Sequence, residues 1–141
     1  FRIHNHRFYR YAQSAMHTVM MTSLPSPIQT VYYPDLFIAV NLCHISPYAA
    51  TEGLFRAAKD HNSILAIYGP FDLNGQHTSP GNASFHESLK QRNPTWGVRD
   101  VSELENTAAA CGYALKQRID MPSNNMTLVF TPIDDTRLSS V

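Results

Sequence analysis

Polar side chains with chemical potential follow directly after an apolar run near the middle of the chain. Leu36 to Val40 is apolar throughout, and Asn41 and His44 come just behind it. An amide here could contact a bound ligand, and the imidazole could orient a second substrate or act as a base. An alternative interpretation is that His44 bonds to the local backbone and shapes the turn.

Further candidates for lining the same site occur later in the chain. Tyr68, Gly69 and Pro70 end a second apolar run, so we expect them to border the same crevice. Asn124 and Asn125 could reach a substrate across its mouth. Ordinary turn chemistry explains an Asn-Asn pair in a tight loop equally well.

A third group of candidates surrounds the single tryptophan. Trp96, Arg99 and Asp100 could form a substrate wall or an anion-binding corner, or they could form a structural latch. The sequence does not decide between these interpretations. His77 and His86 have no partner at a useful spacing, which predicts surface positions for both. His4 and His6 lack further ligands at metal-binding spacing, so we expect no metal site.

The elements that must position these residues predict an α/β fold. Leu36 to Val40 and Ile64 to Tyr68 read as buried strands, the second ending at Gly69 and Pro70. Between them, Ser46 and Pro47 predict the N-cap and first position of an amphipathic helix that runs to about Asp60. A strand, helix, strand order predicts two parallel strands joined by a right-handed crossover.

The second half of the chain predicts two more helices and a closing pair of strands. One helix is expected from about Asn82 to Gln91, and overlapping capping boxes open another at residues 100–105, which Gly112 ends. Tyr113 to Ile119 alternates as a strand should, with Tyr113, Leu115, Gln117 and Ile119 on one side. A loop at residues 121–125 would join it antiparallel to a strand at residues 127–131.

Composition excludes some classes of partner. The 141 residues hold 11 Lys and Arg against 11 Asp and Glu, so we expect neither nucleic acid nor a membrane surface as partner. Cys43 and Cys111 show no disulfide or metal spacing, which fits a reducing intracellular compartment, with the cytoplasm as the expectation.

Three segments are expected. Residues 1–34 are divergent, with an amphipathic helix predicted from Arg7 to Thr22. Residues 35–132 form the main unit, and residues 133–141 form a loose tail.

Five short motifs carry a family resemblance. They are residues 41–47 (NLCHISP), 50–58 (ATEGLFRAA), 68–71 (YGPF), 92–100 (RNPTWGVRD) and 120–125 (DMPSNN). In this order they resemble the family of methyltransferase-like protein 26, a family of unknown function, over about Tyr33 to Phe130. The resemblance implies the carboxyl-terminal half of a class I S-adenosylmethionine-dependent methyltransferase fold, and therefore an incomplete Rossmann-like α/β fold.

The resemblance also implies a cofactor and roles for several candidates. In the complete fold Asn41 and Leu42 would contact S-adenosylmethionine, and His44 would be the candidate catalytic residue. Tyr68, Gly69, Pro70, Trp96, Arg99, Asn124 and Asn125 would line the pocket of an unknown methyl acceptor.

The sequence departs from the resemblance in one important respect. The six glycines lie too far apart for the glycine-rich loop that lets a backbone approach such a cofactor closely. We therefore expect a fragment, a truncated isoform or a misjoined gene product that by itself binds no cofactor and is inactive. The alternative is a non-catalytic remnant that acts by interaction. The Leu36 to Val40 strand would form an exposed apolar edge, through which the chain could self-associate.

Overall fold

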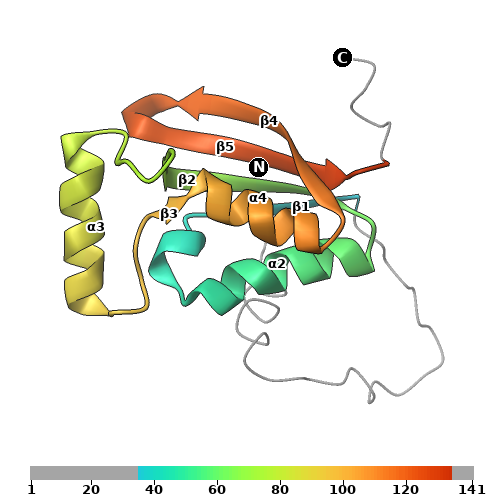
Figure 1. Ribbon diagram of the computed structural model, residues 1–141, viewed down its shortest axis with the longest axis horizontal. Helices are drawn as coiled ribbons and strands as arrows, with labels where there is room; N and C mark the ends of the chain where they lie inside the picture. Colours follow the sequence, from blue (N-terminus) through green and yellow to red (C-terminus); the bar gives the residue numbers. More distant parts are fainter. Residues whose placement is uncertain (1–34, 135–141) are drawn as a thin grey trace.

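A mixed sheet of five strands organises the described part of the chain, residues 35–134 of a computed structural model (Figure 1). The predicted helix from Arg7 to Thr22 and most of the predicted tail lie outside the described residues. In chain order the elements are β1 (Leu36–Val40), the 3-10 helix η1 (Cys43–Ile45), α2 (Tyr48–Asp60), β2 (Ile64–Asp72), α3 (Pro80–Arg92), β3 (Arg99–Asp100), α4 (Val101–Ala110), β4 (Tyr113–Met121), η2 (Pro122–Asn124) and β5 (Asn125–Pro132).

The sheet has the order β1-β2-β5-β4, and the short β3 pairs with β2 beside this path. β1 and β2 run parallel, whereas β5 is antiparallel to both β2 and β4. This confirms the predicted α/β fold, with its parallel crossover and its closing antiparallel pair. None of the described helices has the length and apolar character needed to cross a membrane.

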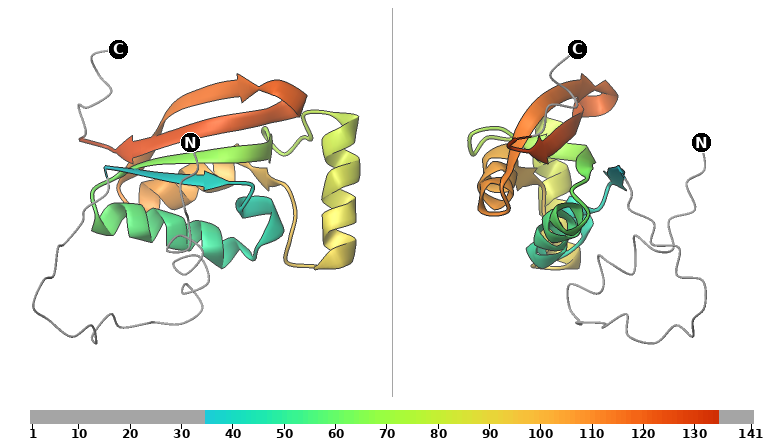
Figure 2. Two further views of the ribbon diagram at one scale, coloured as in Figure 1. Left: turned by 180° about the vertical axis from the view of Figure 1, so that it is seen from behind. Right: turned by 90° about the vertical axis from the view of Figure 1, so that its right-hand side faces the viewer.

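The helices lie unevenly about the sheet. α2 and α4 pack side by side on one face, and α3 stands beyond the carboxyl end of β2 (Figures 1 and 2). No described helix covers the opposite face, where Ala66, Tyr68 and Val129 are only half-buried. The sheet is therefore fully buried on one side only.

The covered face forms the hydrophobic core. Phe55 of α2 is fully buried and meets the ring of Phe130 edge-on, with 4.9 Å between ring centroids. The ring of Tyr113 also packs against Phe55, with 6.5 Å between ring centroids. The Tyr113 hydroxyl donates a hydrogen bond of 2.7 Å to the Ser63 carbonyl. These contacts join α2, β4 and β5 to the turn before β2.

β2 is longer than the sequence predicts. It continues through Gly69 and Pro70 to Asp72, so these two residues lie inside the strand and not at its end. Pro70 is tolerated because it comes at the end of the pairing with β5, opposite Asn125, where the ladder stops. Phe71 and Asp72, which follow Pro70 in β2, pair with Arg99 and Asp100 of β3. The sequence did not predict this short strand.

The helix boundaries confirm two capping predictions and correct one. Asp100 caps α4 in a reciprocal capping box with Glu103, and Gly112 follows its end with φ of 77°, a conformation that favours glycine. Ser46 does not cap α2, because its hydroxyl instead donates to the Leu42 carbonyl at 2.8 Å. Pro47 occupies the cap position and α2 begins at Tyr48.

The predicted alternation along β4 is wrong in its second half. An irregularity between Leu115 and Gln117 shifts the pairing register with β5. Tyr113 is buried, but Gln117 and Ile119 are exposed. A bulge of this kind changes the facing of every later side chain, which apolar periodicity alone does not reveal.

β1 is one of the two edge strands of the described sheet, and the sequence predicts this edge position. Leu36 and Val40 at its two ends are 47% and 59% exposed, although Ala39 between them is buried. Among the strands of residues 35–134, only β2 pairs with β1, so the other edge of β1 is unpaired within this range and its strand carries exposed apolar side chains.

Truncating Phe55 tests the core. We expect Phe55→Ala to lower the free energy of unfolding by about 3–5 kcal/mol, because it removes a large side chain from a closely packed site. Ile133→Ala is the matched control, since Ile133 is 63% exposed, and it should change stability by less than about 0.5 kcal/mol. Urea unfolding followed by circular dichroism measures both. Equal effects of the two variants would contradict this assignment of the core.

Candidate functional site

The candidate site lies where β1 ends beside Tyr68, in the middle of the longer β2. The backbone leaves β1 at Asn41, whose φ of 53° is left-handed and whose N–H donates to the Tyr68 carbonyl at 2.9 Å. Leu42 and η1 follow as a tight turn back towards α2. The exposed Asn41 and half-buried Leu42 therefore lie at the carboxyl end of a parallel strand pair, the position where α/β sheets bind ligands.

His44 is the most buried of the predicted site residues in this loop. Its side chain packs edge-on against Phe85, with 5.4 Å between ring centroids. A Cβ at Gly69 would lie 3.4 Å from the imidazole Nδ1, an ordinary van der Waals contact, so the ring packs directly beside this glycine. Burial, together with the positive charge of Arg99, lowers the pKa of His44 to about 4. The imidazole is therefore neutral near pH 7, with one unprotonated ring nitrogen.

Arg99 acts as a latch between two loops. Its guanidinium donates to the carbonyls of Cys43, Ser46 and Thr95 at 3.1, 2.9 and 2.7 Å. It also lies over the ring of Tyr48, 5.5 Å from the centroid. These three backbone acceptors engage Nε and one of the two terminal nitrogens, which favours the latch over the anion-binding corner.

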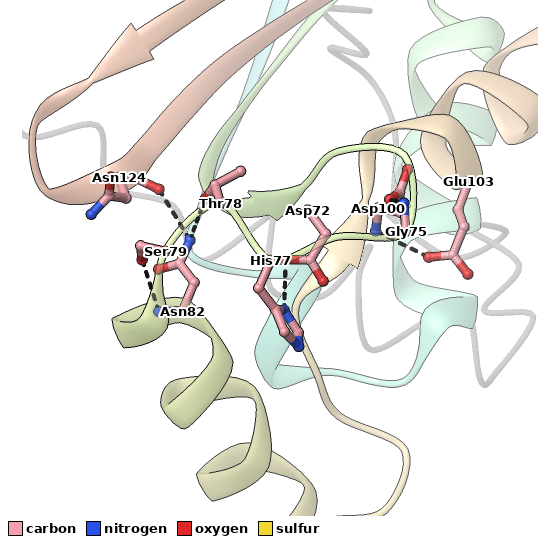
Figure 3. A network of polar contacts seen from close by, with 9 residues as sticks. All are labelled: Asp72, Gly75, His77, Thr78, Ser79, Asn82, Asp100, Glu103 and Asn124. Carbon is pink, nitrogen blue, oxygen red and sulfur yellow. Dashed lines mark hydrogen bonds and ion pairs between the residues drawn. The ribbon is translucent and has the colours of Figure 1, made fainter.

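Asp100 is likewise occupied by structural bonds. The Asp100 carboxylate accepts hydrogen bonds from the N–H groups of Ser102 and Gly75 at 2.8 and 2.6 Å. The Asp100 N–H in turn donates to the Glu103 carboxylate; Figure 3 shows the bonds with Gly75 and Glu103. Burial alone would raise the pKa of Asp100, but the hydrogen bonds to Ser102 and to the turn at Asn74 and Gly75 outweigh it and lower the pKa.

The asparagines near β5 have turn and anchoring contacts. Asn124 has φ of 56°, and its carbonyl accepts a hydrogen bond of 3.3 Å from the buried Asn82 side chain (Figure 3). Asn125 donates to the Pro122 carbonyl at 3.2 Å. The Asn82 side chain also donates to Thr78. Its bond to Asn124 fixes the start of α3 to the β4–β5 turn. The sequence had not marked Asn82 as a candidate site residue.

The remaining predicted pocket residues differ in their burial. Gly69 and Pro70 are buried inside β2, and Tyr68 is half-buried beside Asn41. Trp96 is half-buried in the loop before β3. The next residue, Gly97, donates its N–H to the His44 carbonyl at 3.0 Å. This bond ties the tryptophan loop to the predicted site.

The prediction that His77 and His86 lack partners is wrong. His77 Nδ1 lies 2.9 Å from Asp72 Oδ1, and the two histidine rings are 5.1 Å apart (Figure 3 shows His77 and Asp72). The Asn74-Gly75 turn and the first turns of α3 bring them together. The turn was visible in the sequence, but its link to α3 was not.

Comparison with known proteins places the chain in a family. The chain belongs to a family described as "Protein of unknown function (DUF938)", whose model matches residues 14–132. Its fold is methyltransferase-like, as the solved structures that it resembles indicate.

Three of these structures illustrate the likeness. The mitomycin 7-O-methyltransferase MmcR has a TM-score of 0.59 and 10% identity, over 78% of this chain and 31% of that one. CalO1, a methyltransferase in calicheamicin biosynthesis, has a TM-score of 0.58 and 14% identity, over 70% and 30%. A pericyclic reaction enzyme has a TM-score of 0.60 and 17% identity, over 86% and 34%. The chain thus spans about a third of the length of each.

The buried His44 makes stability depend on pH. The unfolded chain takes up this proton near the ordinary pKa of 6.5, whereas the folded chain takes it up only at about 4. The His44 contribution is therefore fully present above pH 6.5 and is lost as the pH falls towards 4. We expect His44→Gln to flatten this part of the stability curve, measured by urea unfolding between pH 7 and pH 4.

His61→Gln controls for the loss of an imidazole as such. His61 lies at the far end of α2, where its ring contacts Phe37. If both variants flatten the curve equally, the dependence does not come from His44.

Proposed function

We propose that this chain forms the carboxyl-terminal half of a class I S-adenosylmethionine-dependent methyltransferase domain of the methyltransferase-like protein 26 type. The observation that carries the proposal is the sheet. β1 and β2 run parallel, and β5, which lies between β2 and β4, runs antiparallel to both of these neighbours. The likeness to CalO1 and MmcR supports it.

The residues present fit only one side of such a cofactor site. Asn41 and Leu42, at the carboxyl end of β1, suit the cofactor side of the crevice. The chain's six glycines form no glycine-rich loop that would let a backbone approach the nucleoside part of the cofactor closely. We therefore derive no reaction step through the cofactor.

On the acceptor side, His44 is the best-placed candidate. It is neutral, buried and next to Gly69, and it could orient an acceptor group or take its proton. Methyl transfer from a sulfonium depends mainly on alignment, so a neutral, fixed side chain can contribute without being an obligatory base. The methyl acceptor itself is left open.

Cofactor binding tests the proposal. We expect the 141-residue chain alone to show no saturable binding of S-adenosylmethionine in titration calorimetry, because the glycine-rich loop and the ribose-side contacts are missing. The endogenous polypeptide, captured with an antibody against residues 92–100, should be heavier than 15.9 kDa by intact mass and should bind the cofactor. A heavier species that binds none would overturn the methyltransferase proposal, and one-to-one binding by the short chain would overturn the division into halves.

A matched pair of variants in the heavier species sharpens this test. Asn41→Gly keeps the left-handed backbone but removes the amide, so it should weaken cofactor binding by roughly tenfold. Asn62→Gly is the control, because Asn62 has a similar φ of 50° at the far end of α2. Equal effects of the two would remove Asn41 from the site.

We also propose that the short chain self-associates through β1. Its edge carries Leu36 and Val40, both exposed. Light scattering after size exclusion should show a mass that rises with concentration, and Val40→Lys should shift the chain towards monomer. Ile133→Lys, on an equally exposed residue outside the sheet edge, should not. A wild-type chain that stays monomeric, or equal effects of both variants, would contradict this.

A further inference from the structure

Three potential metal ligands converge at the carboxyl end of β2. Asp72 ends the strand and is buried, His77 follows in the next loop with its side chain 35% exposed, and His86 lies half-buried on α3. One donor atom from each residue lies within 4.8 Å of the other two. The group joins three separate elements and is not a run of neighbouring side chains.

A tight turn brings His77 back to Asp72. Leu73 and Gln76 exchange two backbone hydrogen bonds of 3.0 and 3.1 Å across Asn74 and Gly75, whose φ values are 54° and 75°. The carboxylate of Asp100 holds this turn through the Gly75 N–H. Backbone bonds thus fix the turn that ends at Gln76, directly before His77, independently of any ion.

His86 is positioned by the packing of α3. Ser79 caps the helix, and the buried Asn82 anchors its first turn to the Asn124 carbonyl (Figure 3). A Cβ at Gly97 would lie 3.0 Å from the His86 Cε1, so the ring fits against bare backbone. Within residues 35–134, the buried Nδ1 of His86 has no hydrogen-bond partner.

We propose that Asp72, His77 and His86 bind one divalent transition-metal ion, with zinc as the best match. Two imidazoles and one carboxylate are the ligand set of catalytic zinc sites, which keep a fourth position open. Donors around a tetrahedral zinc are about 3.4 Å apart, so the observed separations of up to 4.8 Å require only small side-chain adjustments. The exposed side of His77 leaves the fourth position to water or a ligand.

The surrounding charges permit this assignment. The Asp72 carboxylate offsets part of the charge of the ion. Lys90 is the cation on the same face of α3 as His86. Its ammonium group donates a hydrogen bond of 3.1 Å to the Pro94 carbonyl. Because the site uses none of the residues assigned to cofactor or acceptor binding, it stands or falls separately from the proposed function.

Zinc titration of the full 141-residue chain tests the site. His4, His6 and His17 are changed to Gln throughout, so that only the four histidines of the described region remain. We expect one zinc ion per chain in competition with a chromophoric chelator, and cobalt should give the visible absorption of a tetrahedral site. His86→Gln and Asp72→Asn should each weaken zinc binding by at least roughly tenfold.

Two further variants separate ligation from folding. His86→Asp keeps a ligating side chain and should retain zinc binding, whereas His61→Gln, outside the cluster, should leave it unchanged. Circular dichroism confirms that each variant is folded. The proposal would be overturned if the double variant with His77→Gln and His86→Gln bound zinc as tightly as the parent. It would equally be overturned if neither protein bound zinc.

Discussion

The structure depends on β5 having partners along both edges. It pairs antiparallel with β2 from Leu65 to Pro70 and with β4 along nearly its whole length. Its buried side chains, including Leu128 and Phe130, face the helices of the covered side. Without β5, β4 would lose its strand pairing to the rest of the sheet, and Phe55 would lose its principal aromatic neighbour. The last described strand thus completes the core.

This dependence explains which parts of the fold could be predicted from sequence. Leu36–Val40 and Ile64–Tyr68 are apolar enough to predict strands, although only Ala39 of the first is buried. Asp100 and Gly112 mark a helix by known capping chemistry. The extension of β2 to Asp72 could not be predicted, because Pro70 normally ends a strand and is tolerated here only by the position of Asn125 across the ladder. The irregularity beside Leu115 is equally hidden, since it depends on pairing with β5.

The same distinction applies to the candidate site. The strand end at Asn41 was predictable because a polar residue follows an apolar run. Whether Arg99 would meet an anion or a carbonyl was not, because its acceptors on Cys43 and Ser46 are more than fifty residues away in the chain. The meeting of His77 with His86 required the Asn74-Gly75 turn and the anchoring of α3 to act together. Local patterns predict the elements, and long-range contacts decide which side chains meet. The fold alone does not fix the chemistry, since one similar structure is a pericyclic reaction enzyme.

The Arg99 latch also has a consequence for local motion. Its guanidinium holds the carbonyls of the first residue of η1, of Ser46 after η1 and of Thr95 in the loop before β3, and the Gly97 N–H adds a bond to the His44 carbonyl. The loop at residues 43–46 cannot open without breaking bonds of the loop at residues 95–99. The two loops therefore form a single cooperative unit, whose amide protons would exchange with solvent together and more slowly than those of either loop alone.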